Sequence, residues 1–295
     1  MIKKLLVASL TCAFLALPPL IWFMSAGQYK VHGPVQVLSQ YLKLVYARDF
    51  SRAYRYISAE DRRLKKSSHY VSERGPFGGF ALEVARKLAG LIDMRPLSGH
   101  FEGSRYRVSL AMKLPDANSI APLLLDWDEK KLNALSAAER KKILQAVDNL
   151  IGAGKLPMIE GEEQFVLVKE GSRWKVFLDW AAGAQVRFAA KLPARGGLAA
   201  APLIRETVAR SGDLFTVGFK VTNPTDREVV TRIVHRVEPK ELAEYLELVE
   251  CALLLPVRIH PGEEQVYNST YVVRGDLPDG TKTLNITYEF HLENQ

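Results

Sequence analysis

The stretch Y-L-E-L-V-E-C-A-L-L-L-P-V-R-I-H-P-G-E, residues 245–263, decides how the second half of this chain folds. Its centre is a mostly apolar run, residues 248–255, which ends at Pro256 and has the length and boundaries of a core strand. The segment H-P-G-E, residues 260–263, then indicates a tight turn, because proline presets one backbone angle and glycine supplies a positive φ. Cys251 lies in the middle of the strand and is the only cysteine outside the N-terminal apolar run.

Further strands surround this segment. Apolar and polar residues alternate over residues 215–222, 229–233, 267–273 and 284–290, and turn signals separate these runs. Short strands at such spacing predict a β-sandwich, which we place at residues 203–295.

The preceding half reads as an α+β unit, residues 33–182. Helical periodicity comes first, from residue 35, and a strand pattern follows at residues 106–114. A capping box then opens a helix at Ser136, and a hairpin closes the unit at residues 164–179. Alanine, glycine and proline dominate the residues that follow, so we expect a linker at residues 183–202.

The N-terminus carries a targeting or membrane segment. Residues 5–24 are mostly apolar and uncharged, which is long enough for a membrane-spanning helix. Lys3 and Lys4 precede them and would stay cytoplasmic. Residues 1–27 are therefore expected to be an uncleaved membrane anchor, with a cleaved signal sequence as the alternative, and everything after them is exported.

Composition limits the function classes. A chain of 295 residues with 47% hydrophobic and 25% charged residues is typical of globular domains. The net charge of +7 is spread along the chain, so we expect no nucleic-acid partner. The sequence has no glycine-rich phosphate loop, no G-x-S-x-G and no H-E-x-x-H, and no spacing forces an acid–base pair, so we expect no enzyme.

A basic set lies in the early helices and has two interpretations. It comprises Arg48, Arg52, Arg55, Arg62, Arg63, Lys65 and Lys66. One interpretation is a solvated helix face, the usual fate of a charge run. The other is contact with anionic headgroups, since these helices follow the anchor closely.

Residues 245–263 resemble the CtaG-type cytochrome c oxidase assembly family of periplasmic copper chaperones. In that family a Tyr-Phe pair precedes an Ile/Val-Glu/Gln-Cys-Phe-Cys-Phe strand, and a Pro-Gly-Glu turn follows at the distance seen here. The resemblance covers about residues 203–291 and includes N-x-x-D at residues 223–226 and the last strand, T-L-N-I-T-Y-E-F, at residues 283–290. It implies an immunoglobulin-like β-sandwich.

The resemblance also implies a copper site, but half of the family's Cys-x-Cys motif is missing. Two thiolates on one face of a strand suit Cu(I), a soft ion, whereas here Leu253 holds the second position. Cys251 is therefore the one metal ligand carried over. A homodimer could pair two Cys251 side chains, or the imidazole of His235 or His260 could complete a Cu(I) site. In the other interpretation Cys251 is a small buried hydrophobe, and we expect a copper site that is weakened or lost.

Residues 33–182 resemble the nuclear transport factor two-like superfamily, which has a cone-shaped α+β fold with a pocket. The resemblance rests on G-P-V at residues 33–35, D-F-x-x-A-Y at 49–54, S-A-E-D-R at 58–62 and G-x-x-W-K-V at 171–176. Some members of this superfamily are enzymes and many only bind or scaffold, so the fold implies no activity.

Two functions follow as expectations. The first is a membrane-anchored accessory protein of cytochrome c oxidase assembly, single-pass in a bacterial inner membrane with the bulk of the chain in the periplasm. Its partner would be a respiratory oxidase subunit or another assembly factor. The alternative is a non-enzymatic binding module whose cone domain holds a small apolar ligand or a peptide.

Overall fold

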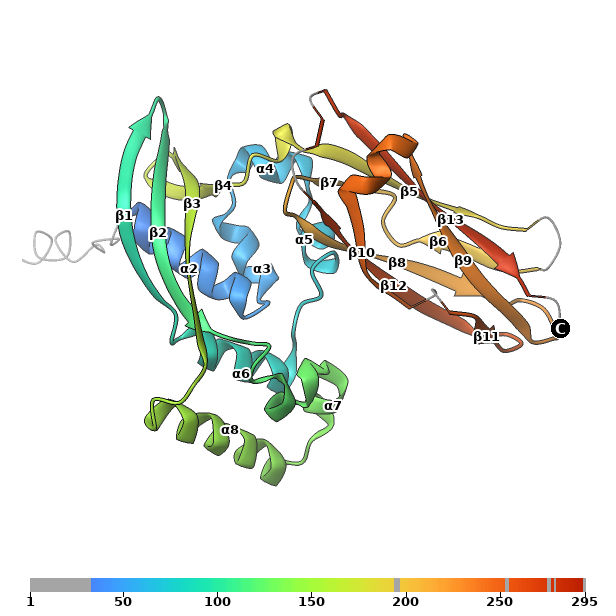
Figure 1. The fold of residues 1–295 in the computed structure, drawn as a ribbon, viewed down its shortest axis with the longest axis horizontal. Coiled ribbons are helices and arrows are strands. Elements are labelled where there is room, and N and C mark those ends of the chain that lie inside the picture. The colour runs from blue at the N-terminus through green and yellow to red at the C-terminus, as the bar shows by residue number, and fades with distance from the viewer. Residues whose placement is uncertain (1–32, 194–196, 253–254, 275–276, 279, 294–295) are drawn as a thin grey trace, which may run out of the picture.

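Helices come first in this protein and strands dominate afterwards, as the sequence predicts. The computed structural model describes residues 33–193, 197–252, 255–274, 277–278 and 280–293. A unit of helices and one sheet lies on one side of the molecule, and a unit built mainly of strands lies on the other (Figure 1). In the described residues no helix combines the length and the apolar character needed to cross a bilayer, and the expected anchor, residues 1–27, lies outside them.

The first unit opens with short helices that pack on one another. They are α2 (Pro34–Tyr46), α3 (Phe50–Ala53), the 3-10 helix η1 (Tyr54–Tyr56), α4 (Ala59–Leu64), α5 (Ser67–Ser72) and α6 (Gly79–Ala89). Pro34 stands in the first turn of α2, where a missing N–H costs nothing. Ser58 caps α4 by accepting a hydrogen bond from the Asp61 backbone N–H.

An antiparallel sheet completes the first unit, with strand order β1-β2-β3-β4. Its strands are β1 (Asp93–Glu102), β2 (Arg105–Pro115), β3 (Met158–Glu170) and β4 (Arg173–Phe177). Between β2 and β3 lie η2 (Ala121–Trp127), α7 (Glu129–Ala134) and α8 (Ala137–Gly152). The predicted capping box of α8 is confirmed, since Ser136 and Glu139 bond each other's backbone N–H. Leu38 of α2 and Leu110 and Leu167 of the sheet share one core.

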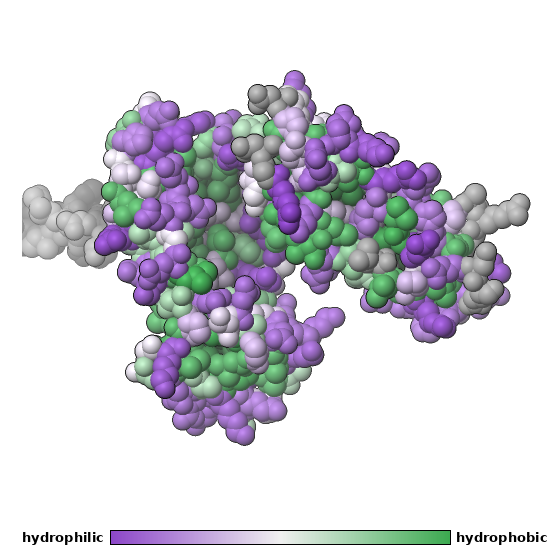
Figure 2. All heavy atoms as spheres, viewed as in Figure 1, coloured by the Kyte–Doolittle hydropathy of each residue, from purple (hydrophilic) through white to green (hydrophobic). Residues whose placement is uncertain are grey.

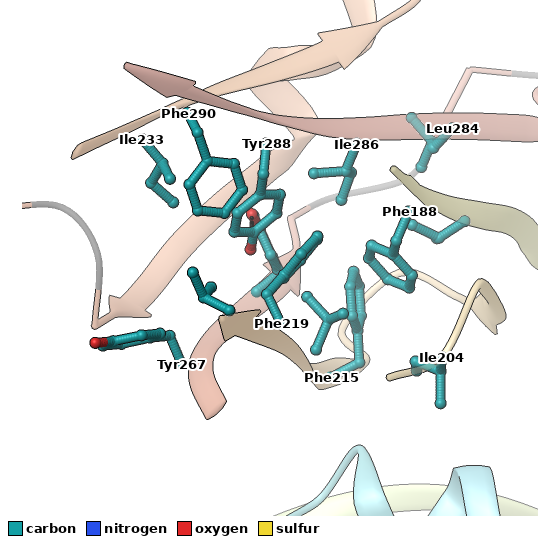
Figure 3. Packing of buried hydrophobic residues seen from close by; sticks show 14 of the residues in the cluster. Phe188, Ile204, Phe215, Phe219, Ile233, Tyr267, Leu284, Ile286, Tyr288 and Phe290 are labelled. Carbon is teal, nitrogen blue, oxygen red and sulfur yellow. Dashed lines mark hydrogen bonds between the residues drawn. The ribbon is translucent and has the colours of Figure 1, made fainter. Parts of the chain in front are cut away.

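The second unit consists of two sheets that enclose one hydrophobic core. One sheet has the order β11-β9-β13-β5-β7 and the other β10-β12-β8-β6. The strands are β5 (Ala184–Lys191), β6 (Ala199–Pro202), β7 (Glu206–Ala209), β8 (Leu214–Thr222), β9 (Val229–Glu238), β10 (Leu246–Cys251), β11 (Val257–Ile259), β12 (Glu264–Val273) and β13 (Thr283–Leu292), with the 3-10 helices η3 (Trp180–Ala182) and η4 (Lys240–Tyr245). Figure 3 shows Phe219 and Tyr288 face to face in this core, with ring centroids 3.7 Å apart.

The linker expected at residues 183–202 is largely structured. Its residues 184–191 form β5, which lies between β13 and β7 in the five-stranded sheet. Residues 199–202 form β6 at the edge of the other sheet. The strand is hard to see in the sequence because β5 pairs in parallel with β13, about a hundred residues later in the chain. The strand unit therefore begins before residue 203.

The two units contact each other through backbone and charged groups. The Thr216 backbone N–H in β8 donates to the Glu73 carbonyl oxygen at 2.7 Å. The Arg210 guanidinium donates to the Leu178 carbonyl oxygen at 2.6 Å. Figure 2 shows apolar side chains in the angle between the units and around α7 and α8, while hydrophilic side chains cover most of the remaining visible surface.

Candidate functional site

Cys251 ends β10, and β10 is an edge strand rather than the expected core strand. The strand pairs only with β12, where Cys251 lies opposite Ser269, and the register shifts between Leu248 and Glu250. Glutamates at two of its six positions turn to solvent, and Val249 is 55% exposed. The apolar composition of residues 248–255 suggested burial on both faces, but β10 buries only one. The free thiol of Cys251 is half-buried on that inner face.

His235 reaches Cys251 from the opposite sheet. It stands on β9, and its Nε2 atom lies 3.3 Å from Cys251 Sγ. Its Nδ1 atom contacts the Tyr271 hydroxyl on β12. Burial lowers the pKa of His235 from 6.5 to about 4, because the charged imidazolium loses hydration. The imidazole is therefore neutral near pH 7 and keeps a lone pair for a proton or a metal.

Three hydroxyl groups extend this pair into a chain of hydrogen bonds. Tyr271 and Tyr288 lie 2.7 Å apart through their hydroxyl oxygens. The Ser269 hydroxyl donates to Cys251 Sγ at 3.3 Å. Burial raises the pKa of both tyrosines above the usual value, so both remain protonated at any physiological pH. Each of the five side chains thus has a polar partner inside the sandwich.

The pair Cys251 and His235 fits a soft metal ion only as a two-donor site. An ion bonded to sulfur at about 2.3 Å and to nitrogen at about 2.0 Å can bridge atoms up to about 4.3 Å apart, so the separation of 3.3 Å needs no backbone movement. Thiolate and imidazole are both ligands for copper. Within the described residues, however, no group of three or more Cys, His, Asp or Glu side chains could hold a metal.

The other sequence candidates do not join this site. His260 is 69% exposed and pairs with Glu228, with its Nδ1 atom 3.2 Å from a carboxylate oxygen. Leu253, at the family's second cysteine position, lies outside the described residues. Ser269 and Tyr271 were predicted to share one face of a strand, but no signal in the sequence linked that face to Cys251.

The sheet of the first unit carries a charged groove. A groove of about 440 Å³ crosses β1, β2 and β3. Its lining includes Asp93, Arg95, Lys113 and Glu160, and Lys113 and Glu160 form an ion pair of 2.8 Å across it. Such a lining does not favour a small apolar ligand, which prefers hydrophobic and aromatic walls.

Comparison with known proteins supports one family for part of the chain. Residues 160–292 match the family described as cytochrome c oxidase assembly protein CtaG/Cox11. The resemblance predicted from the sequence is thereby confirmed for the sandwich, and the match begins in β3. No curated protein matches the chain. No comparison bears on the likeness of residues 33–182 to nuclear transport factor two.

Similar solved structures are distant. A FixG-related protein from Vibrio parahaemolyticus has 8% identity and a TM-score of 0.21, covering 34% of this chain and 100% of its own. Native E. coli alpha-2-macroglobulin has 11% identity and a TM-score of 0.22, covering 68% of this chain and 16% of its own. Salmonella alpha-2-macroglobulin has 11% identity and a TM-score of 0.21, again covering 68% of this chain and 16% of its own. Scores this low support no fold assignment.

Proposed function

We propose that this protein is an accessory factor in cytochrome c oxidase assembly that acts by binding rather than by catalysis. The observation that carries the proposal is the match of residues 160–292 to the assembly family, with Cys251 at the family's first cysteine position. Its partner is an oxidase subunit or another assembly factor, and a homodimer would bring two copies of the site together. The sandwich is of the immunoglobulin-like kind that this family implies.

The protein is proposed to be anchored in a bacterial inner membrane and to face the periplasm. The support is the uncharged apolar run of residues 5–24 after Lys3 and Lys4. The family is periplasmic, which agrees with export of both units. We retain the nuclear transport factor two-like fold as the proposal for the helix-and-sheet unit.

We propose that any copper this chain carries is cargo and is bound weakly. Cys251 would supply a thiolate and His235 a neutral imidazole, in place of the two thiolates of the family motif. Binding requires loss of the thiol proton, and Sγ would exchange its contact with His235 Nε2 for the ion. One soft donor fewer lowers the affinity for Cu(I), so docking to the partner is the main role.

The copper part is tested by titrating the full chain in detergent with Cu(I) against a competing chelator. We expect weak binding that Cys251→Ala abolishes and that His235→Gln weakens by at least about tenfold, since one of two donors is lost. His260→Gln is the matched control and should bind like the unaltered chain. Tight stoichiometric binding abolished by Cys251→Ala would show a full copper chaperone instead.

The assembly part is tested in cells. Removal of this chain should lower assembled oxidase, measured as cytochrome c oxidation by isolated membranes. If docking is the main role, the Cys251→Ala chain should restore most of that activity. Unchanged oxidase in cells without the chain would contradict the assembly role altogether, whatever the copper titration shows.

A further inference from the structure

The basic set of the early helices separates into paired and unpaired cations. Lys65 is buried and pairs with Glu73 at 2.8 Å, and Arg52 lies 3.5 Å from Asp49. Several cations without an ion pair among the described residues lie on η1, α4, β4 and the residues beside them, whereas Arg48 of the same set lies over the Phe77 ring. We call the group on these elements the basic face, and it consists of Arg55, Arg62, Arg63, Lys66, Arg173 and Lys175.

The unpaired state of the basic face contrasts with the sandwich. Cations on the sandwich strands pair with glutamates, as Lys220 does with Glu264 at 2.8 Å. Near the basic face stand three carboxylates, Glu60, Asp61 and Glu170. Glu170 accepts a hydrogen bond from the Ala59 backbone N–H, and Asp61 accepts from the backbone N–H groups of Leu178 and Trp180. Six cations against three carboxylates leave a local charge of +3.

The cations of the basic face lie close enough to repel one another. The Lys175 ammonium donates to the Arg55 carbonyl oxygen at 2.5 Å, which joins β4 to η1. The pKa of Lys175 is lowered, first by burial and then by the like charge of Arg62; Glu170 opposes this shift, and Arg173 adds to it. The buried Nε atom of Arg62 has no hydrogen-bond partner among the described residues. Such crowding destabilises the free chain and is relieved by an anion.

An apolar side chain stands within this face. Leu64 is 47% exposed at the end of α4, next to Arg63 and two residues before Lys66. Cations around an exposed leucine match the membrane interface, where phosphates meet the charges and the acyl boundary accepts the apolar group. A free phosphate ion would leave Leu64 in water.

The first helix after the expected anchor contacts one strand of this face. Between residue 24 and the start of α2 at Pro34 lie nine residues, which reach about 30 Å at most when extended. β4, which carries Arg173 and Lys175, packs against α2. We propose that the basic face binds anionic phospholipid headgroups of the membrane that holds the anchor, an inference that rests on the proposed anchoring.

Hydrogen exchange on the full chain in lipid nanodiscs tests this proposal. We compare neutral phosphatidylcholine with a mixture containing phosphatidylglycerol and follow the amides of α4, with those of α8 as internal reference. Exchange of α4 should slow at least about fivefold in the anionic discs only, and 0.5 M NaCl should restore it. Equal exchange of α4 in both lipids would overturn the proposal.

Two charge-matched variants make the result specific. The pair Arg63→Gln and Lys66→Gln should lower the ratio of docked to free α4 about 25-fold, since each cation near an anionic surface contributes about fivefold. The control pair Lys141→Gln and Lys142→Gln on α8 removes the same charge and should leave exchange of α4 unchanged. If both pairs of substitutions removed the protection of α4 equally, the effect would depend on net charge alone, and the proposed site would be overturned.

Two further measurements distinguish a membrane surface from a phosphate-ion pocket, and failure of the anchor from failure of the basic face. Inorganic phosphate that slows α4 exchange in neutral discs would show an ion pocket instead of a membrane surface and overturn the proposal. Retention of the chain by neutral discs reports on the anchor alone. Loss from neutral discs with slowed α4 exchange on anionic ones would therefore refute the anchor and support the basic face.

Discussion

Replacing Lys65 by methionine should destabilise the first unit by about 3–5 kcal/mol, the usual cost of removing one partner from a buried ion pair. The Lys65 side chain is 3% exposed and that of Glu73 is 1% exposed, and the two atoms of the pair lie 2.8 Å apart. Methionine fills a similar volume, so the main loss is the charge. The Glu73 carboxylate would stay buried, and its Oε1 atom already has no hydrogen-bond partner in the described chain.

A second contact adds to this loss. The Lys65 ammonium lies 4.9 Å from the ring centroid of Trp180, which contributes about 0.5–1 kcal/mol more. Glu73 also matters beyond the first unit, because its carbonyl oxygen accepts the Thr216 N–H from the sandwich at 2.7 Å. A first unit loosened at Glu73 should therefore also weaken the contact between the units.

Urea unfolding of the full chain in detergent measures the effect. The tryptophans of the described residues are Trp127, Trp174 and Trp180. The Trp180 side chain, although on η3, packs into the core of the first unit, so the fluorescence of all three reports on that unit. With an m-value of about 2 kcal/mol/M, a loss of about 4 kcal/mol lowers the midpoint by about 2 M. The double variant Lys65→Met with Glu73→Leu carries no unpaired charge and should recover most of the loss. Single-variant costs that simply add in the double variant would refute the reasoning.

Two predictions concern the sandwich. The pKa of His235 is about 4 in the folded protein, below its ordinary value of 6.5. The unfolded chain therefore binds more protons than the folded chain between pH 6.5 and pH 4. The free energy of unfolding should fall by up to about 3 kcal/mol as the pH drops through this range. His235→Phe should flatten this dependence in urea midpoints, and an unchanged slope would contradict it. Gly218→Ala should lower the free energy of unfolding by about 1–3 kcal/mol, because the added Cβ would lie 2.9 Å from Leu203 Cδ1. An unshifted melting temperature would contradict this prediction and show that Leu203 moves aside freely.

Local patterns in the sequence predicted local structure well. The alternation of residues 215–222 and 267–273 matches β8 and β12, because one face of each strand is buried and the other is wet. The capping box at Ser136 could also be predicted from the sequence, because its two partners lie three residues apart.

Elements that depend on a partner elsewhere in the chain were missed. β1 contains Pro96 and Gly99, which argue against a strand, yet it is the edge of its sheet, where proline is tolerated, and its register shifts at Pro96. β5 was hidden by its alanine-rich composition, and its place in the sheet depends on parallel pairing with β13. The meeting of His235 with Cys251 likewise depends on how two sheets stack, which no spacing in the sequence encodes.

The hydrogen-bonded cluster around Cys251 satisfies the polar side chains in this part of the sandwich interior. Cysteine, histidine, serine and the two tyrosines each have a hydrogen to donate and a lone pair to accept one, and each of the five has at least one partner in this chain of hydrogen bonds. Buried polar groups are costly only when unpaired, so this hydrogen-bonded cluster adds no such cost to the interior. An incoming ion must break the contact between Cys251 and His235 and compete with it. On the proposed function, this competition favours a sandwich that docks over one that delivers copper.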